Sequence, residues 1–469
     1  MKKLKTYLVV LVFIFCIFLL WEQILYVPFD HDENHFLAAV YLVNKGFLPY
    51  LDFPYNHTPL YPYIALPFYK LISYKFLTLR ILSGLAFLGV LIITFLKISK
   101  KSLSLALIFI STIILSKLIV FNTCLLRPNN LALFLAILAF YLIDDHYKND
   151  LFVGLLLTFS TGIRITYALL FLPFRFFINS KEKIKNFYFG LLLGCLPLIF
   201  FFIKTPSKFI FHTIVQPIKR GTFYILFGYK NYLGFTGRIK AIYKAFLFSH
   251  DLIIIFFLLL LSPFIIKFKT RRDIFLILTL TAVLIQCILP APVWYQYFIP
   301  LYTFTIIIFI EIYPVKILKI IFSICLIINL YLTAPWYWQK IKLNFHNSVP
   351  EKVHHLGKAI AYYTNSQGKI LTLNTAFPIE GGLEIYREIP SVFPWREAIF
   401  LDKSLRKKYH LYGPKELDQI TKQNPPKAVL TGLENPWLEK PLKTWAQKHH
   451  YRPIGLGSLK LWLKRQNEK

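Results

Sequence analysis

Long apolar runs alternate with short polar stretches through residues 1–335. The runs are bounded by charged residues or by clusters of Pro, Asn and Gly. Most approach the roughly 20 residues that an α-helix needs to cross the hydrocarbon core of a bilayer. We therefore predict about eleven membrane-spanning helices, at 6–22, 80–97, 102–121, 130–143, 151–163, 166–179, 187–203, 251–267, 273–290, 297–313 and 315–333.

The basic residues predict how these helices are oriented. Cytoplasmic loops of membrane proteins are enriched in Lys and Arg. Here such residues follow four of the five spans predicted to end inside, at Lys97, Lys100, Lys101, Lys181, Lys183, Lys185, Lys267, Lys269, Arg271, Arg272, Lys316 and Lys319. The fifth inner loop, 144–150, goes against the pattern with three acids and one Lys, although acids weigh little in the rule. We expect a cytoplasmic N-terminus and, after an odd number of spans, an extracytoplasmic C-terminus. Residues 21–23 (Trp-Glu-Gln) stand where a signal peptide would have a small-residue cleavage site, so the first run is predicted to be an uncleaved span.

Two stretches between the first and second spans are predicted to lie along the outer membrane surface. Residues 33–45 place apolar side chains at helical spacing with polar residues opposite, as an interfacial helix does. Residues 59–77 are apolar but interrupted by Pro59, Pro62 and Pro67. A span at 59–77 would invert every later loop, which the charge pattern argues against.

The composition changes after Pro335, where no run is long enough to cross a membrane. Short strands are predicted at 369–373, 428–431 and 459–463, and helices at 351–365, 414–423 and 437–449. The predicted fold is therefore mainly α. A polytopic helical membrane domain (1–335) is followed by a small extracytoplasmic, periplasmic α/β domain (336–469).

Composition narrows the class of protein further. Of 469 residues, 56% are hydrophobic and 16% are charged, which excludes an ordinary soluble enzyme. The net charge of +31 would suggest nucleic acid in a soluble chain, but cytoplasmic loops account for it here, so we expect a lipid bilayer and no nucleic acid as partner. The five cysteines show no CxxC or Cys/His spacing, so neither a disulfide framework nor a metal site is expected from them.

The densest polar cluster follows the first span, at Asp30-His31-Asp32-Glu33, with Asp52 and His57 further along the same loop. Asp32 could cap the helix at 33–45, with Glu33 favoured by the helix dipole in the first turn. Asp32 could also act in catalysis, and both readings can hold because a cap position fixes a carboxylate in space.

Basic and aromatic residues at other predicted outer ends offer partners for these acids. Arg164 interrupts an apolar stretch, where it either snorkels to lipid phosphate or binds a substrate phosphate. Loop 204–250 carries Arg220 and Arg238 among many basic residues, forming either a solvated surface or a wall that attracts an anionic headgroup. Tyr295 and Tyr297 are typical of an interfacial aromatic belt and are alternatively substrate contacts.

In this order the motifs resemble a known family. The succession is Asp32-Glu33 at the head of an interfacial helix, Gly46-x-x-Pro49-Tyr50-x-Asp52, Thr58-Pro59-Leu60, Gly162-x-Arg164 and Tyr297-x-x-Pro300. It is similar to the GT-C membrane glycosyltransferases, in particular bacterial relatives of protein O-mannosyltransferases and of the lipid A aminoarabinose transferase.

The resemblance implies roles for individual residues. Asp32 matches the family's catalytic base, with Glu33 beside it, and Arg164 matches the basic residue that faces the lipid phosphate. His57 falls where the aminoarabinose transferase has Lys. Asn56 replaces a metal-binding Glu of that relative, so a divalent metal is disfavoured and no cofactor is assigned.

The implied reaction moves a hexose or pentose from a polyprenyl-phosphate carrier to an extracytoplasmic acceptor: an envelope glycan, lipid or protein. Asp32 would take the acceptor's proton, and Arg164 with Arg220 or Arg238 would stabilise the departing phosphate. Asp30, Asp52, His57, Tyr295 and Tyr297 are expected to contact substrate. A single carboxylate without a nucleophilic partner favours inversion.

Two other functions stay open. A transporter or lipid flippase would place ionisable groups at mid-span, whereas these acids are gathered in one external loop. A non-catalytic membrane scaffold presenting residues 336–469 has no need of an acid cluster.

Overall fold

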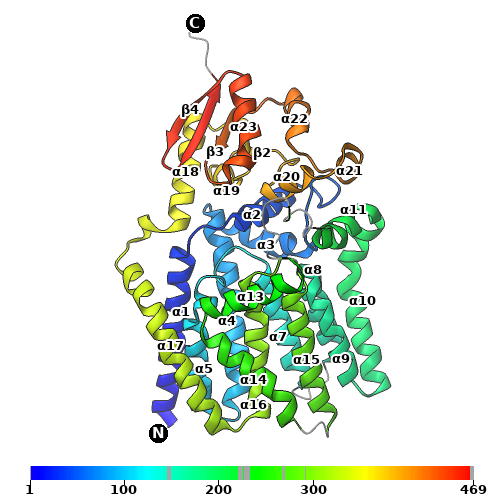
Figure 1. The fold of residues 1–469 in the computed structure, drawn as a ribbon, viewed down its shortest axis with the longest axis vertical. Coiled ribbons are helices and arrows are strands. Elements are labelled where there is room, and N and C mark those ends of the chain that lie inside the picture. Colours follow the sequence, from blue (N-terminus) through cyan, green and yellow to red (C-terminus); the bar gives the residue numbers. More distant parts are fainter. Residues whose placement is uncertain are drawn as a thin grey trace.

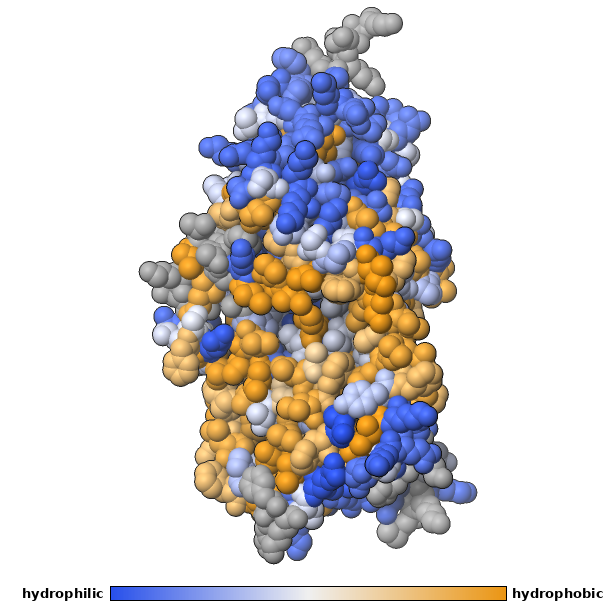
Figure 2. Space-filling model, turned by 90° about the vertical axis from the view of Figure 1, so that its right-hand side faces the viewer, coloured by the Kyte–Doolittle hydropathy of each residue, from blue (hydrophilic) through white to orange (hydrophobic). Residues whose placement is uncertain are grey.

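The computed structural model describes residues 2–144, 149–219, 225, 233–266, 270–290 and 292–464. Long helices form a bundle, and a small domain of strands and short helices is stacked on one end of it (Figure 1). The N-terminus lies at the end of the bundle opposite that domain (Figure 1). A hydrophobic band covers the middle of the molecule, with hydrophilic residues above and below it (Figure 2).

Each predicted span coincides with a helical segment. The segments are α1 (Lys2–Tyr26), α4 (Lys75–Ser99), α5 (Leu103–Leu115), α7 (Asn129–Asp144), α8 (Asp150–Ile163), η1 (Ile165–Leu170) with α9 (Phe171–Phe177), α10 (Lys181–Lys204), α14 (Asp251–Ile265), α15 (Arg271–Ile288), α16 (Ile299–Ile312) and α17 (Val315–Ile341). Within the described residues, five helices are long and apolar enough to cross a membrane by length and composition: α1, α4, α10, α16 with its preceding turn, and α17. The polytopic helical fold is confirmed.

Helices α8 and α10 show how closely the bundle packs. A Cβ atom at Gly154 would overlap the backbone of Phe187, and one at Gly190 would overlap the backbone of Leu151. In a lipid bilayer the hydrophobic effect does not drive helices together. Membrane helices therefore often associate through small residues that allow their backbones to pack closely. This contact fixes α8, and with it the side chain of Arg164 at its end.

Shorter helices cover the end of the bundle beneath the C-terminal domain. They are α2 (His31–Asn44), α3 (Leu60–Leu71), α6 (Lys117–Val120), α11 (Pro206–Ile210), η2 (Phe211–Val215), α13 (Gly234–Phe248) and η4 (Tyr295–Phe298). Both helices predicted after the first span are present, as α2 and α3. Neither crosses the bundle, as Figure 1 shows.

The prediction that α2 exposes a polar face was wrong, because every residue from Glu33 to Val43 is buried. The C-terminal domain covers the polar side: the Asn34 side chain accepts a 2.9 Å hydrogen bond from the Ala376 amide, and the His35 ring lies 2.9 Å from the Ser391 hydroxyl. Helix α2 is therefore held between the bundle and the domain.

The C-terminal domain is the expected α/β unit. Its elements are η5 (Phe345–Asn347), α18 (Val349–Tyr363), β1 (Lys369–Thr372), α19 (Ala376–Glu380), β2 (Glu384–Ile385), α20 (Val392–Ala398), α21 (Lys403–Tyr409), η6 (Pro414–Glu416), α22 (Leu417–Gln423), β3 (Ala428–Thr431), α23 (Pro436–Lys448), β4 (Tyr451–Leu456) and β5 (Leu459–Lys464). The sheet order is β2-β1-β3-β5-β4, parallel from β2 to β3 and antiparallel from β3 to β4. The prediction missed β2, which has two residues, and β4, an edge strand containing Pro453.

The junction between the two parts is continuous. Helix α17 runs through Pro335 without a break and ends at Ile341. The Tyr26 hydroxyl, at the end of α1, lies 3.1 Å from the carbonyl oxygens of both Leu343 and Asn344. Buried residues of the domain such as Ile360 belong to the same hydrophobic core as the bundle. The boundary at 335 and 336 stays a prediction.

Candidate functional site

The start of α2 is organised by Asp30, so the reading of Asp32 as the helix cap, one of the two left open by the sequence, was wrong. The Asp30 carboxylate accepts a 2.8 Å hydrogen bond from the Asp32 amide, and the Glu33 carboxylate accepts a 3.0 Å bond from the Asp30 amide. This reciprocal arrangement is a capping box. Because Asp30 takes the capping role, the Asp32 side chain is left to other partners.

One buried arginine holds both aspartates. Nη2 of Arg127 lies 2.8 Å from Oδ1 of Asp30 and 3.1 Å from Oδ2 of Asp32. Burial by itself would raise the pKa of Asp30, but the charges of Arg127 and His31 and the hydrogen bonds it accepts bring that pKa below its ordinary value. Burial opposes the charged form of Arg127, yet Asp32 and Asp30 outweigh it and raise the pKa of the guanidinium.

Arg127 also has unused hydrogen-bonding capacity. Its Nε and Nη1 atoms are buried and have no hydrogen-bond partner among the described residues. A buried donor without a partner is costly, and the cost disappears when a ligand accepts the bond. Arg127 therefore lines the cavity with hydrogen-bond donors that its two aspartate partners do not use.

These residues open onto a cavity of about 460 Å³ between the bundle and the C-terminal domain. Its lining includes Asp30, His31, Asp32, Asn56, His57, Asn122, Arg127, Asn129, Arg164, Trp294, Tyr295, Gln296, Tyr297, Phe393 and Arg396. Asp30, His31 and Asp32 come from the start of α2, and Asn56 and His57 come from the loop between α2 and α3. Phe393 and Arg396 come from α20. A narrower pocket shares Asn129, Arg164, Gln296 and Tyr297 with the cavity and continues to Tyr167 and Gln286 among the membrane helices.

Arg164 enters the cavity from the end of α8. Its guanidinium lies 4.8 Å from the centre of the Tyr297 ring and donates a hydrogen bond to the Asn129 side chain. The stacked ring and the amide fix the orientation of the planar guanidinium. Both partners of Arg164, Tyr297 of the Trp294–Tyr297 turn and Asn129 of α7, also line the cavity.

The structure brings together six of the residues singled out from the sequence: Asp30, Asp32, His57, Arg164, Tyr295 and Tyr297. They come from four separate stretches of the chain. Their chemical roles stay predictions.

Glu33 does not line this cavity, contrary to the catalytic role expected for it. Its carboxylate forms two 2.7 Å contacts with Nε and Nη2 of Arg80, and both side chains are completely buried. It also accepts hydrogen bonds from the amides of Asp30, at 3.0 Å, and Leu126, at 2.8 Å. Glu33 therefore holds α1, α2 and α4 together.

Three other expected substrate contacts lie elsewhere or outside the described residues. Asp52 accepts a 2.8 Å hydrogen bond from the Leu48 amide within its own turn. Arg238 donates a 2.9 Å bond to the Ile288 carbonyl. Arg220 lies outside the described residues. Among the described residues, the arginines that line the cavity are Arg127, Arg164 and Arg396.

Sequence reasoning missed Arg127 and Arg396 as site residues. Arg127 stands alone before an apolar run, and the reasoning that singled out Arg164 applies to it equally. Arg396 lies on α20 of the C-terminal domain. Because that domain was expected to be separate from the membrane part, nothing placed Arg396 at the cavity. The Asp-x-x-Glu spacing of Asp30 and Glu33 was the available signal for the true cap.

Two groups of side chains in the described part of the chain could bring three metal-ligand atoms together: Asp30, His31 and Asp32, and His346, Glu351 and His355. In the first group, Arg127 contacts one oxygen of each carboxylate, so a cation bound there would lie beside a buried guanidinium. Asn56, where the resemblance implies a glutamate ligand, offers only a neutral amide. Both features disfavour a metal at the described cavity residues.

Comparison with known proteins supports the fold. No family model matches the chain, and no match is found among curated protein sequences. By its fold the chain is a bundle of apolar helices with a small α/β domain at one end, and solved structures share this fold. Two crystal structures of ArnT from Cupriavidus metallidurans share it. One, bound to undecaprenyl phosphate, has a TM-score of 0.63 and 9% identity over 98% of each chain. The apo form has a TM-score of 0.60 and 8% identity, covering 97% of this chain and 98% of ArnT.

Proposed function

We propose that this chain is a membrane glycosyltransferase that moves a sugar from a polyprenyl-phosphate carrier to an extracytoplasmic acceptor. The observation that carries the proposal is the cavity itself, where an aspartate pair faces three arginines at the junction of the bundle and the C-terminal domain. The fold adds support, because the ArnT structure that shares it holds undecaprenyl phosphate.

The phosphate of the donor fits the arginine side of the cavity. Arg164 presents an oriented guanidinium, and Arg127 presents two buried donors without partners. Cations fixed in this way stabilise the negative charge that develops on phosphate as the bond to the sugar breaks. The lipid chain would then extend from this side of the cavity towards the membrane helices.

The acceptor's proton goes to Asp32 in this proposal. Its side chain is 25% exposed, with one oxygen 3.1 Å from Arg127 and the other 3.3 Å from the His31 ring. A carboxylate held at a fixed position beside the anomeric carbon can act as general base. Asp30 is occupied as the helix cap, so no second carboxylate is offered as nucleophile and direct displacement with inversion follows.

The acceptor would reach Asp32 from the side of the C-terminal domain. Phe393 and Arg396 of α20 form part of the cavity lining there. His57, Tyr295 and Tyr297 then remain to contact the sugar. This division places the lipid within the bundle and the acceptor at the water-exposed domain.

Binding of the lipid tests the donor side. In native mass spectrometry, purified protein in detergent should retain undecaprenyl phosphate in preference to phosphatidylglycerol. The Arg164→Ala variant should retain less undecaprenyl phosphate than the wild-type protein. Asp52→Asn, which changes a charged residue outside the cavity in the loop between α2 and α3, serves as the control and should bind normally. Equal retention of both lipids by the wild-type protein would contradict the proposal.

Loss of the protein tests the reaction. Cells that lack it should lose one sugar mass from an envelope glycan, lipid or protein, and the size of the loss distinguishes a hexose from a pentose. Unchanged envelope masses in the deletion strain would remove the case for transfer.

The proposed topology places the N-terminus in the cytoplasm and the cavity outside. Reporter fusions after Lys101 and after Lys464 should then report opposite sides of the membrane. The two positions reporting the same side would contradict this arrangement.

A further inference from the structure

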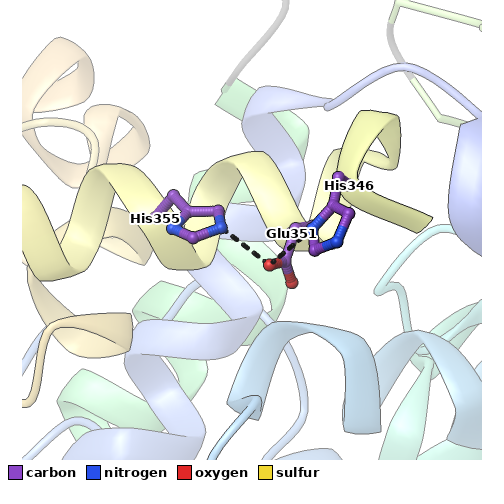
Figure 3. Close-up of side chains that lie close together, drawn as sticks. All are labelled: His346, Glu351 and His355. Carbon is purple, nitrogen blue, oxygen red and sulfur yellow. Dashed lines mark ion pairs between the residues drawn. The ribbon is translucent and has the colours of Figure 1, made fainter. Parts of the chain in front are cut away.

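A second cluster of chemically active side chains lies away from the cavity, where α17 passes into the C-terminal domain. His346 belongs to the turn η5, and Glu351 and His355 lie four residues apart on α18. Figure 3 shows the two histidines on either side of the Glu351 carboxylate. The three residues therefore face one another across the junction of a turn and a helix.

The donor atoms of the cluster converge. Nε2 of His355 lies 2.8 Å and Nδ1 of His346 lies 3.8 Å from Oε1 of Glu351, and all three atoms are within 4.8 Å of one another. Zinc binds His nitrogen and carboxylate oxygen at about 2.0–2.2 Å, which in a tetrahedron separates neighbouring donors by roughly 3.4 Å. The two distances from Oε1 of Glu351, 2.8 and 3.8 Å, lie on either side of that value. Small side-chain rotations would therefore bring all three donors to zinc-binding positions.

Local structure holds the carboxylate in place and leaves the histidines accessible. Ser348 caps α18 by accepting a 3.3 Å hydrogen bond from the Glu351 amide. The Glu351 side chain is 5% exposed, whereas those of His346 and His355 are 78% and 67% exposed. The spacing of four residues places Glu351 and His355 on one face of the helix.

Other histidines that pair with a carboxylate in the C-terminal domain lack this convergence. His354 contacts Glu380 at 2.8 Å, and His449 contacts Asp418 at 3.4 Å. Neither pair belongs to a group of three ligand atoms among the described residues. One histidine is enough to neutralise a carboxylate, so a second one aimed at the same oxygen needs another explanation.

We propose that His346, Glu351 and His355 form a binding site for a divalent transition metal of the zinc class. Two imidazoles and one carboxylate are a ligand set that zinc favours, and with three protein ligands the fourth position stays open to water. The metal ties η5 to α18 and thereby fixes the C-terminal domain on the end of α17. This site is independent of the transferase proposal.

Cobalt titration of the full-length protein in detergent, stripped of metal, tests the site. Co²⁺ in a tetrahedral N and O environment absorbs visible light, and Zn²⁺ should displace it. We expect one Co²⁺ per chain. His355→Gln and His346→Gln should each weaken binding by more than about 100-fold, since even partners outside the ligand set cost 10–100-fold. His449→Gln, which removes an exposed histidine paired with a carboxylate, should bind normally.

Two further readings separate lost ligation from lost folding. Without metal, His346→Gln should melt at the wild-type temperature, because its exposed ring lies outside the helix. Zn²⁺ should raise the melting temperature of the wild-type protein and of His449→Gln, but not that of His346→Gln. Binding should also weaken at acid pH, because a protonated imidazole cannot ligate a metal. The proposal is overturned if the wild type takes up no stoichiometric Co²⁺, if His449→Gln loses binding equally, or if only Asp32→Asn loses it.

Discussion

Two carboxylate–arginine centres lie less than one helical turn apart at the start of α2. Glu33 and Arg80 are completely buried, and their carboxylate and guanidinium face each other at 2.7 Å. Asp30 and Asp32 share Arg127 at 2.8 and 3.1 Å, at the edge of a cavity. The two centres use the same kinds of side chain but differ in two respects. They differ in how exposed their side chains are and in how many hydrogen-bond donors have no partner in the protein.

The sealed centre has every polar atom engaged with protein. Arg80 also donates to the carbonyl oxygens of Ile24 and Val27, at 3.0 and 2.9 Å, so its charge is compensated on all sides. At the open centre, Arg127 keeps two donors without partners and Asp32 reaches the cavity. The first centre stabilises the junction of three helices, and the second is the one that we propose binds an anion and accepts a proton.

The largest expected effect comes from breaking the sealed centre. Glu33→Gln keeps the shape of the side chain but leaves the Arg80 charge buried without a counterion, which typically costs about 3–5 kcal/mol. We expect little folded protein in the membrane and a strongly lowered melting temperature in detergent.

The matched control replaces both partners. Glu33→Leu combined with Arg80→Met removes the buried charges together, which is often far less costly than removing one, so the double variant should accumulate better than Glu33→Gln. Normal accumulation and melting of Glu33→Gln would contradict the division into a sealed and an open centre.

A smaller effect is expected at the arginine that faces the cavity from α8. Arg164→Lys keeps the charge but loses the planar fork that Tyr297 and Asn129 orient. Loss of one charge-assisted hydrogen bond of about 1.5 kcal/mol corresponds to roughly tenfold weaker binding of undecaprenyl phosphate. The melting temperature should stay near the wild-type value; equal lipid affinity in both proteins would exclude a phosphate contact.

The smallest effect concerns pH and the cap. The lowered pKa of Asp30 means that its ion pair stabilises the fold above the unfolded value of about 4, and that this contribution is lost as the pH falls through the lower folded value. Asp30→Asn should therefore cost about 1 kcal/mol or less near pH 7. Melting curves should show the difference shrinking towards pH 3; a difference that grows there would be inconsistent with the ion pair.

Much of this architecture could be predicted from sequence because its cause is local. Each apolar run became a helix, since a backbone within lipid must satisfy its own hydrogen bonds. The prolines that interrupt residues 59–77 correctly argued for a short helix, α3, instead of a span. In the C-terminal domain, three strands with dense apolar residues were found and two weakly patterned ones were missed.

The site could be predicted only in part because its contacts join residues far apart in sequence. Arg80 meets Glu33 across 47 positions, and nothing in either neighbourhood specifies the pairing. The polar side of α2 could equally have faced water, and its burial depends on a domain whose docking the sequence did not reveal. Glu33 was therefore assigned to chemistry when its surroundings make it structural.

The most direct test of the account is the transfer rate of Asp32→Asn, measured as sugar-modified envelope material per amount of folded protein. Asparagine keeps the size of the side chain and an oxygen for Arg127, but it has no basic oxygen for the acceptor's proton. The account predicts that Asp32→Asn accumulates normally in the membrane but loses transfer by about 100-fold or more. The matched control, Asp52→Asn, should transfer sugar at the wild-type rate. Normal transfer by Asp32→Asn would contradict the proposed mechanism.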